Sequence, residues 1–238
     1  MWTLPHKEER DKMIIAREKP FEEILSMIEG FKSLLIVGCA GCTAICLAGG
    51  QREVDRLKNE IKLMRKKINN PIQLQGYTVE RQCESYFLSD LDNISAKFDA
   101  ILSLGCGAGV QFIAEHYPEK IVLPALNTLF IGVNRDIGLY EENCRSCGDC
   151  KLAYTGGICP VTRCAKSIFN GPCGGSKNGM CEVDNSVPCA WCEIYERLKS
   201  QNRLHLMYKI HPSVQWKNQK AGFLIQKGFE KKYSHENS

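Results

Sequence analysis

Cysteine is the residue type in this sequence best suited to chemistry. The 238-residue chain contains 14 cysteines, and nine of them lie between Cys144 and Cys192. The first four of the nine have the spacing C-x2-C-x2-C-x8-C, and Pro160 follows the fourth. A thiolate triplet with this spacing can bind three corners of an iron–sulfur cube, and a more distant cysteine can bind the fourth. The pattern therefore indicates a protein that carries metal.

The C-terminal cysteines are too dense to serve only as core residues. Their segment contains few Leu, Ile, Val and Phe residues, and a module without a sizeable apolar core usually needs bound metal in order to fold. Eight of the nine would fill two four-thiolate sites: Cys144, Cys147, Cys150, Cys159, Cys164, Cys173, Cys181 and Cys189. Cys192 is predicted to be left over, and the spacing does not decide how the eight are grouped.

Both iron and zinc accept four thiolates. The close triplet and the Cys159-Pro160 pair favour iron. The gap of eight residues is longer than the three-residue gap of bacterial ferredoxins. The segment is therefore not a ferredoxin.

A second constellation lies near the N-terminus, where Cys39, Cys42 and Cys46 form a C-x2-C-x3-C motif. Cys39 ends one predicted strand, and Cys106 directly follows another. The carboxyl ends of parallel strands form the ligand-binding edge of an open sheet. We therefore expect these four residues to converge on one metal centre, with Cys83 as a rival for the fourth place. In the alternative interpretation, Cys83 and Cys106 are small buried hydrophobic residues.

Alternating strands and helices are predicted to position the N-terminal cysteines. Apolar runs predict strands at 33–38, 72–80, 98–104 and 121–124. Helical periodicity predicts helices at 21–28, 51–68 and 110–116. This order indicates an α/β fold with a mostly parallel sheet and flanking helices.

The rest of the chain has a different character. Residues 1–19 are polar and are expected to form a loose arm or a segment that wraps around a partner. From about residue 141, Gly and Cys become dense, which predicts a loop-rich metal-binding module with short helices at 160–169 and 191–198. The expected division is an α/β domain at 1–140, a Cys-rich module at 141–216 and a polar tail at 217–238.

Composition excludes several function classes. A formal net charge of +4 is too small to indicate nucleic-acid binding. The chain shows no signal peptide and no apolar run long enough to span a membrane, so we expect a cytoplasmic protein. Disulfides rarely persist in that compartment, which favours metal-bound thiolates.

Catalytic side chains are not evident. The five histidines show no metal-ligand pairing, and no Ser/His/Asp set or acid–base carboxylate pair stands out. The glycines at 105–109 lack the G-x-G-x-x-G spacing of a dinucleotide site. No catalytic residue is predicted.

Several long motifs resemble a known family. The C-terminal half contains YTGGICPVTRCAK at 154–166, NGPCGG at 170–175 and CAW at 189–191. The N-terminal half contains VGCAGCTAICLAGG at 37–50, ERQC at 80–83 and LGCGAGVQ at 104–111. Over about residues 13–210, the chain resembles the methylenetetrahydrofolate reductase C-terminal family, in particular its small iron–sulfur subunit from anaerobic one-carbon metabolism.

The resemblance implies a role in electron transfer. Its members carry 4Fe–4S clusters, zinc has also been linked to them, and up to three metal sites are expected here. The partner is a flavin-containing barrel subunit that reduces 5,10-methylenetetrahydrofolate to 5-methyltetrahydrofolate on its FMN. Electrons would come from a ferredoxin or another redox subunit. The family pattern resembles the five N-terminal cysteines and the eight from Cys144 to Cys189, and Cys192 departs from it.

Two other functions stay open at this point. The chain could be a zinc-stabilised scaffold that docks and stabilises the flavoprotein without carrying electrons. It could also be a stand-alone enzyme with its own nucleotide site, although the weak glycine motif argues against that function.

Overall fold

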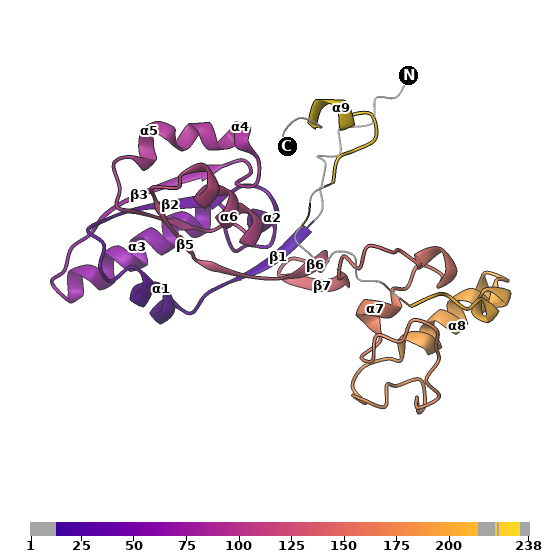
Figure 1. The fold of residues 1–238 in the computed structure, drawn as a ribbon. Coiled ribbons are helices and arrows are strands. Elements are labelled where there is room, and N and C mark those ends of the chain that lie inside the picture. The colour runs from indigo at the N-terminus through magenta and orange to yellow at the C-terminus, as the bar shows by residue number, and fades with distance from the viewer. Residues whose placement is uncertain (1–12, 214–221, 223, 234–238) are drawn as a thin grey trace, which may run out of the picture. The chain divides into compact units, whose positions relative to one another are not determined.

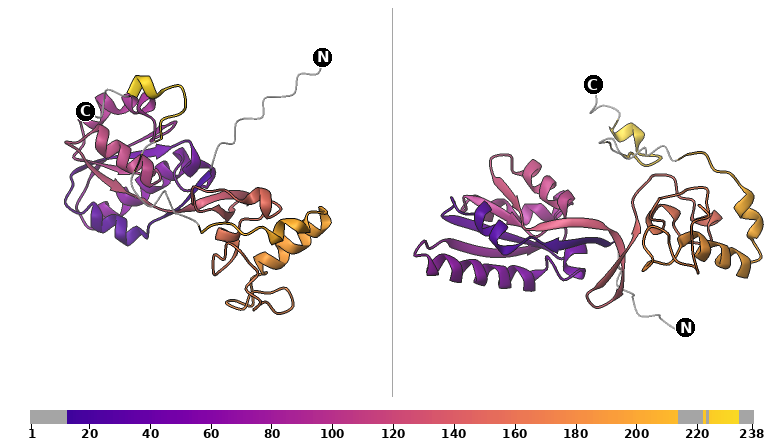
Figure 2. Two further views of the ribbon diagram at one scale, coloured as in Figure 1. Left: turned by 45° about the vertical axis from the view of Figure 1, so that its right-hand side comes forward. Right: turned by 90° about the horizontal axis from the view of Figure 1, so that it is seen from below.

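The computed structural model describes residues 13–213, 222 and 224–233, and its chain divides into two compact units, Met1–Asn143 and Cys144–Ser238. Figure 1 and Figure 2 show the helices and strands of each unit. The first unit is a mixed α/β structure with a parallel sheet and flanking helices. The second is rich in loops and cysteines and holds short helices. The expected fold class is confirmed.

A four-stranded parallel sheet forms the centre of the first unit, in the order β3-β2-β4-β5. Its strands are β2 (Ser33–Cys39), β3 (Gln73–Val79), β4 (Ala100–Ser103) and β5 (Ile121–Pro124). Residue 34 pairs with residue 74 on one side and residue 100 on the other. All four strands lie where apolar runs predicted them.

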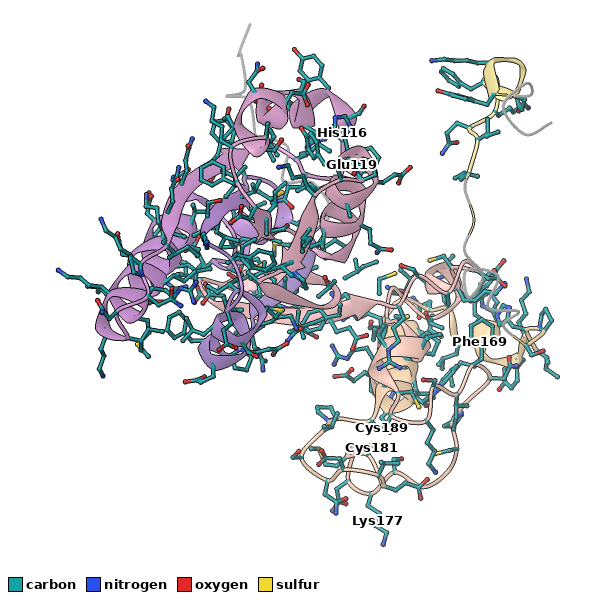
Figure 3. The ribbon with its side chains drawn as sticks, turned by 60° about the vertical axis from the view of Figure 1, so that its left-hand side comes forward. His116, Glu119, Phe169, Lys177, Cys181 and Cys189 are labelled. Carbon is teal, nitrogen blue, oxygen red and sulfur yellow. The ribbon has the colours of Figure 1, made fainter. Side chains whose placement is uncertain are left out.

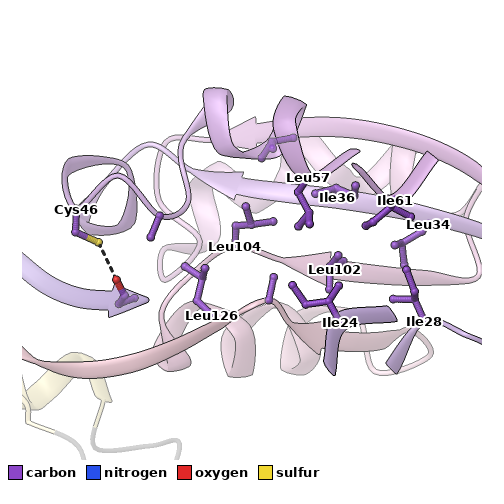
Figure 4. Close-up of a cluster of buried hydrophobic side chains, with 14 of the residues drawn as sticks. Ile24, Ile28, Leu34, Ile36, Cys46, Leu57, Ile61, Leu102, Leu104 and Leu126 are labelled. Atoms are coloured by element: carbon purple, nitrogen blue, oxygen red, sulfur yellow. Dashed lines mark hydrogen bonds between the residues drawn. The ribbon is translucent and has the colours of Figure 1, made fainter. Parts of the chain in front are cut away.

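Helices cover both faces of this sheet (Figure 1). Side chains alternate along β2, which is buried throughout. Leu34 and Ile36 pack with α1 (Phe21–Met27) and α3 (Gln51–Lys67), as Figure 4 shows. Leu35 and Val37 face the other side.

The second face is covered by shorter helices. They are α4 (Ser85–Leu88), η1 (Ser89–Leu91), α5 (Asp92–Ser95) and α6 (Gly107–His116). Leu88, Leu91 and Ile113 from these helices are fully buried against the sheet. Burial of each such side chain stabilises the fold by roughly 1.5–3 kcal/mol. Two apolar layers therefore fix where the strands end.

A second sheet lies outside the predicted one, with the order β1-β6-β7. It consists of β1 (Met13–Glu18), β6 (Leu126–Asp136) and β7 (Leu139–Cys144). β1 pairs antiparallel with β6, with an irregularity between Ile15 and Ala16. The expectation of a loose arm at 1–19 is wrong for residues 13–18, because this strand finds its partner more than 100 residues away; residues 1–12 lie outside the described residues.

The second unit contains few regular elements. They are η2 (Leu152–Tyr154), α7 (Pro160–Arg163), α8 (Ala190–Ser200), η3 (Leu204–Tyr208) and α9 (Glu230–Tyr233). Trp191, Ile194 and Leu198 of α8 form its small apolar cluster.

Two predictions for the second unit need comment. The helix predicted at 160–169 is wrong beyond Arg163, because the backbone becomes extended at Cys164 (φ −91°, ψ 122°) and turns again at Ser167 with a φ of +49°. The predicted tail at 217–238 falls partly outside the described residues. In the part of the chain that is described, every helix is too short or too polar to cross a membrane.

Candidate metal centre

Three adjacent strand ends bring four cysteines to one edge of the parallel sheet. Cys39 is the last residue of β2, and Cys42 is the first residue of α2 (Cys42–Ile45). Cys83 follows β3, and Cys106 is the N-cap of α6, just beyond β4. Because β3, β2 and β4 are neighbours, their carboxyl ends meet at this edge. We call these four residues the strand-end cysteines.

The strand-end cysteines lie within electrostatic reach of one another. Although Cys83 is exposed, neighbouring groups partly exclude water from its thiol and raise its pKa, and the charges of Cys106, Cys39 and Cys42 raise it further. Cys39 also donates to the carbonyl oxygen of Glu80, at 3.9 Å. Crowded thiolates repel one another, and a bound cation reverses that effect. The electrostatics of this edge therefore suit a metal ion or cluster.

The four thiols fit a metal group with four thiolate ligands, although their sulfur atoms do not yet form a coordination sphere. Among residues 13–213, 222 and 224–233, no three His, Cys, Asp or Glu side chains are close enough to hold a metal ion as they stand. Cys83 is exposed, and Cys42 and Cys106 are half-buried, so the edge is open to solvent. Four thiolates without histidine suit zinc or an iron–sulfur cluster.

The side chain of Gln82 joins these strand ends through hydrogen bonds. Its side chain is only 1% exposed. Its Nε2 donates to the carbonyl oxygen of Val37 at 2.9 Å, and its Oε1 accepts from Ser103 Oγ at 2.6 Å. A Cβ atom at Gly105 would lie 2.1 Å from that Oε1, so only glycine fits there. Gln82, the residue before Cys83, therefore links β2 and β4 through its side chain. Nothing in the sequence alone indicates this role.

The Cys46 thiol is within electrostatic reach of Cys42 but bonds to backbone carbonyls. This thiol contacts the carbonyl oxygens of Ala16 at 3.6 Å and Thr43 at 3.5 Å, as Figure 4 shows for Ala16. Burial is the main cause that raises its pKa. The structure therefore places Cys46 in the apolar core, and it places both rivals for the fourth place, Cys83 and Cys106, just beyond strand ends.

The close triplet Cys144, Cys147 and Cys150 lies where β7 ends and a loop follows. The backbone N–H of Ser146 donates to Cys144 Sγ at 3.4 Å. Cys147 donates to the carbonyl oxygen of Asp149 at 3.8 Å. Cys144 and Cys150 are exposed, so the loop presents its sulfurs to solvent.

Cys159 and Cys164 bracket the single turn of α7 as its N-cap and C-cap. Pro160 occupies the first helical position, where its missing N–H costs no hydrogen bond. Cys164 packs against the apolar cluster of α8.

A positive and a negative side chain accompany Cys173 and Cys181. Lys166 and Glu182 form an ion pair, and Cys173 donates to Glu182 at 3.4 Å. The hydrogen bond with Glu182 is the main cause that raises the pKa of Lys166, and the charges of Cys173 and Cys181 add to it. Lys166 therefore lies where it can offset thiolate charge.

Backbone pairing brings Cys181 beside Cys189. Met180 and Pro188 form a bridge. The N–H of Cys181 donates to the Val187 carbonyl at 2.9 Å, and the N–H of Cys189 donates to the Gly179 carbonyl at 2.8 Å. Figure 3 shows both cysteines at the same end of this loop.

Cys189 shares its surroundings with Cys192. Burial opposes ionisation of Cys189, but hydrogen bonds from the backbone of Cys192 and Trp191, from the Cys192 thiol and from Ser176 lower its pKa overall. Cys189 is also the N-cap of α8, where the helix dipole favours negative charge. Cys192 donates to Ser176 at 3.4 Å. Cys192, which was predicted from the sequence to be left over, therefore lies beside Cys189. The C-x2-C spacing of these two residues was the sequence signal that could have predicted this.

A hollow of about 600 Å³ lies beside the C-terminal end of α2. Cys46, Leu47, Leu129, Leu139 and Tyr140 line part of it. Three of them are unusually exposed for leucines: Leu47 at 49%, Leu129 at 44% and Leu139 at 59%. Exposed apolar surface of this kind often marks a protein contact.

Comparison with known proteins gives one match. Residues 123–217, less than half of the chain, match the family described as the C-terminal region of methylene-tetrahydrofolate reductase. No curated protein and no solved structure matches the chain. The match supports the resemblance seen in the C-terminal motifs and associates this part of the chain with that reductase.

Proposed function

We propose that this chain is the iron–sulfur electron-transfer subunit of a methylenetetrahydrofolate reductase. The observation that carries the proposal is the convergence of Cys39, Cys42, Cys83 and Cys106 from three neighbouring strand ends. The family match of residues 123–217 supports the association with the reductase. The eight cysteines from Cys144 to Cys189 would supply further sites, and Cys192 belongs to the same candidate set.

When bound, a 4Fe–4S cluster supplies reversible one-electron chemistry, whereas zinc supplies none. The chain's own residues hold and tune such a group. Gln82 fixes the strand ends that carry three of the four N-terminal thiols. In the second unit, Lys166 and the N-terminus of α8 offset thiolate charge. Hydrogen bonds, burial and nearby charge are the means by which proteins set a cluster's potential.

The proposed partner is a flavin-containing barrel subunit that binds FMN and the folate substrate. A ferredoxin or another redox subunit would supply the electrons. The exposed leucines beside α2 offer apolar surface for a stable subunit contact. In this function the chain itself contributes no catalytic residue.

The proposal is tested by purifying the full chain with its flavoprotein under anaerobic conditions. Iron, zinc and acid-labile sulfide are measured per chain, with absorbance near ~400 nm, where thiolate-ligated iron absorbs. We expect bound iron and sulfide, bleaching on reduction, and FMN reduction by the electron donor only when this chain is present. A colourless preparation that holds only zinc and is fully active would contradict the proposal and favour the scaffold function.

A further inference from the structure

A second hollow, of about 340 Å³, lies within the Cys-rich unit and uses none of its cysteines. It is lined by η2, by the chain before Pro172, by the start of α8 and by the chain after η3. Four rings and two ammonium groups are on its walls: Tyr154, Phe169, Trp191, His211, Lys151 and Lys209. No Asp or Glu is among the described residues that line it. We call it the aromatic pocket.

Hydrogen bonds and close packing fix the pocket's walls in advance. Trp191 Nε1 donates to the carbonyl oxygen of Ile168 at 2.9 Å. The Gly171 backbone presses on the same indole, because a Cβ there would lie 2.3 Å from the ring. Asn170 makes two bonds with the backbone of His211, at 2.7 and 2.9 Å. A pocket formed before binding loses little entropy when a ligand enters.

The pocket's field is positive. Lys209 Nζ lies 4.4 Å from the centroid of the Tyr154 ring, and Lys151 Nζ lies 6.0 Å from that of Phe169. Lys151 is also paired with Asp149 at 2.7 Å, outside the lining. Burial, followed by the charges of Lys151 and Lys209, lowers the pKa of His211. Lys209 has no acidic partner among the described residues and is the cation available to a ligand.

We propose that the aromatic pocket binds a small, flat aromatic molecule that carries a carboxylate or a phosphate. The rings of the pocket already pack together, with the centroids of Tyr154 and His211 4.6 Å apart. A flat aromatic ligand extends this ring cluster through face or edge contacts. The ammonium group of Lys209 favours an anionic substituent at the mouth. The volume falls within the range of small-molecule sites. This binding site is independent of the electron-transfer role.

The test uses the full chain, purified anaerobically with its metal, and isothermal titration with naphthalene-2-carboxylate. Two relatives of the probe separate the contributions: the neutral naphthalene-2-carboxamide and the non-aromatic cyclohexanecarboxylate. We expect the aromatic carboxylate to bind about tenfold more tightly than either relative, the size of one charge-assisted contact or one stacked ring. Its affinity should fall as salt rises.

Two variants assign the binding to this pocket. Lys209→Gln should weaken the carboxylate about tenfold and leave the carboxamide unchanged, because it removes only the charge. Lys199→Gln is the matched control, since Lys199 also lies over a tyrosine ring, at 5.8 Å from Tyr195, but outside the pocket. Phe169→Leu should weaken both aromatic probes and leave cyclohexanecarboxylate unchanged.

Several results would overturn the proposal. They are no binding of the aromatic carboxylate, equal binding of its carboxamide, or equal losses from the Lys209 and Lys199 variants. Thermal unfolding and metal content are first measured for each variant and compared with the parent chain. If Lys209→Gln has a folding defect, the assignment to this pocket depends on Phe169→Leu.

Discussion

Replacing Gln82 with methionine should loosen the strand-end cysteines without removing any thiol. Methionine keeps most of the buried volume but loses the bonds to Val37 at 2.9 Å and to Ser103 at 2.6 Å. Each such bond contributes about 1 kcal/mol to the free energy of unfolding. Both partners keep another bond: Val37 accepts from Leu104 at 2.8 Å, and Ser103 accepts from the Gly105 N–H at 3.1 Å. The Ser103 O–H, however, loses its acceptor in a fully buried site, so the expected loss is about 2–4 kcal/mol.

The loss of metal affinity in this variant should be larger than the loss of folding stability alone predicts. Loss of an outer hydrogen bond that orients metal ligands commonly costs about 10–100-fold in metal affinity. We expect a chelator to remove the first unit's metal at least about tenfold faster from Gln82→Met than from the parent chain. Metal release is followed by absorbance and metal analysis. The kinetic phase of release that is absent from Cys83→Ser belongs to the site in the first unit.

A matched control lies at the opposite ends of the same strands. Ser33 is also buried, and its Oγ accepts from the Asp99 N–H at 2.9 Å. Ser33→Ala should cost about 1–2 kcal/mol in urea unfolding and leave metal release unchanged. If both variants released metal equally fast at equal loss of stability, Gln82 would have no positioning role and the reasoning would be refuted.

Four further outcomes follow from the same geometry. Cys83→Ser should lower the metal bound per chain, whereas Cys46→Ser should retain it, because the Cys46 thiol bonds to carbonyls in the core; equal metal loss in both would contradict this assignment. Gly171→Ala should destabilise the second unit by about 1–3 kcal/mol and change its near-ultraviolet circular dichroism, since the new Cβ overlaps the Trp191 ring. Leu139→Asp should weaken co-purification with the flavoprotein and leave metal content unchanged, and unchanged co-purification would exclude the hollow beside α2 as the contact. Lys166→Met should leave iron and zinc content unchanged but shift the reduction potential of the C-terminal unit downward, as measured by a redox titration, because it removes positive charge beside Cys173 and Cys181; an unmoved potential would show that no cluster lies there.

Local patterns were sufficient to predict the parallel sheet. Within the run at 33–38, residues 34–37 all carry apolar side chains, and such a run is stable only when both faces are covered, as the two clusters around Leu34 and Leu35 show. The helix at 51–68 followed from its apolar stripe and became α3, Gln51–Lys67. By contrast, β1 could not be predicted, because its partner β6 is distant in sequence and pairing over that distance leaves no local signal.

The sequence by itself determined the donor chemistry and the fold class, because residue type and short-range periodicity are local properties. It also placed Cys39 and Cys106 after strands. Only the tertiary structure decided that Cys83 comes to the same edge of the sheet while Cys46 turns into the core, since those positions depend on which strands are neighbours and on which way a side chain points. The buried clamp of Gln82 likewise arises from packing between segments far apart in the chain, which no spacing rule encodes.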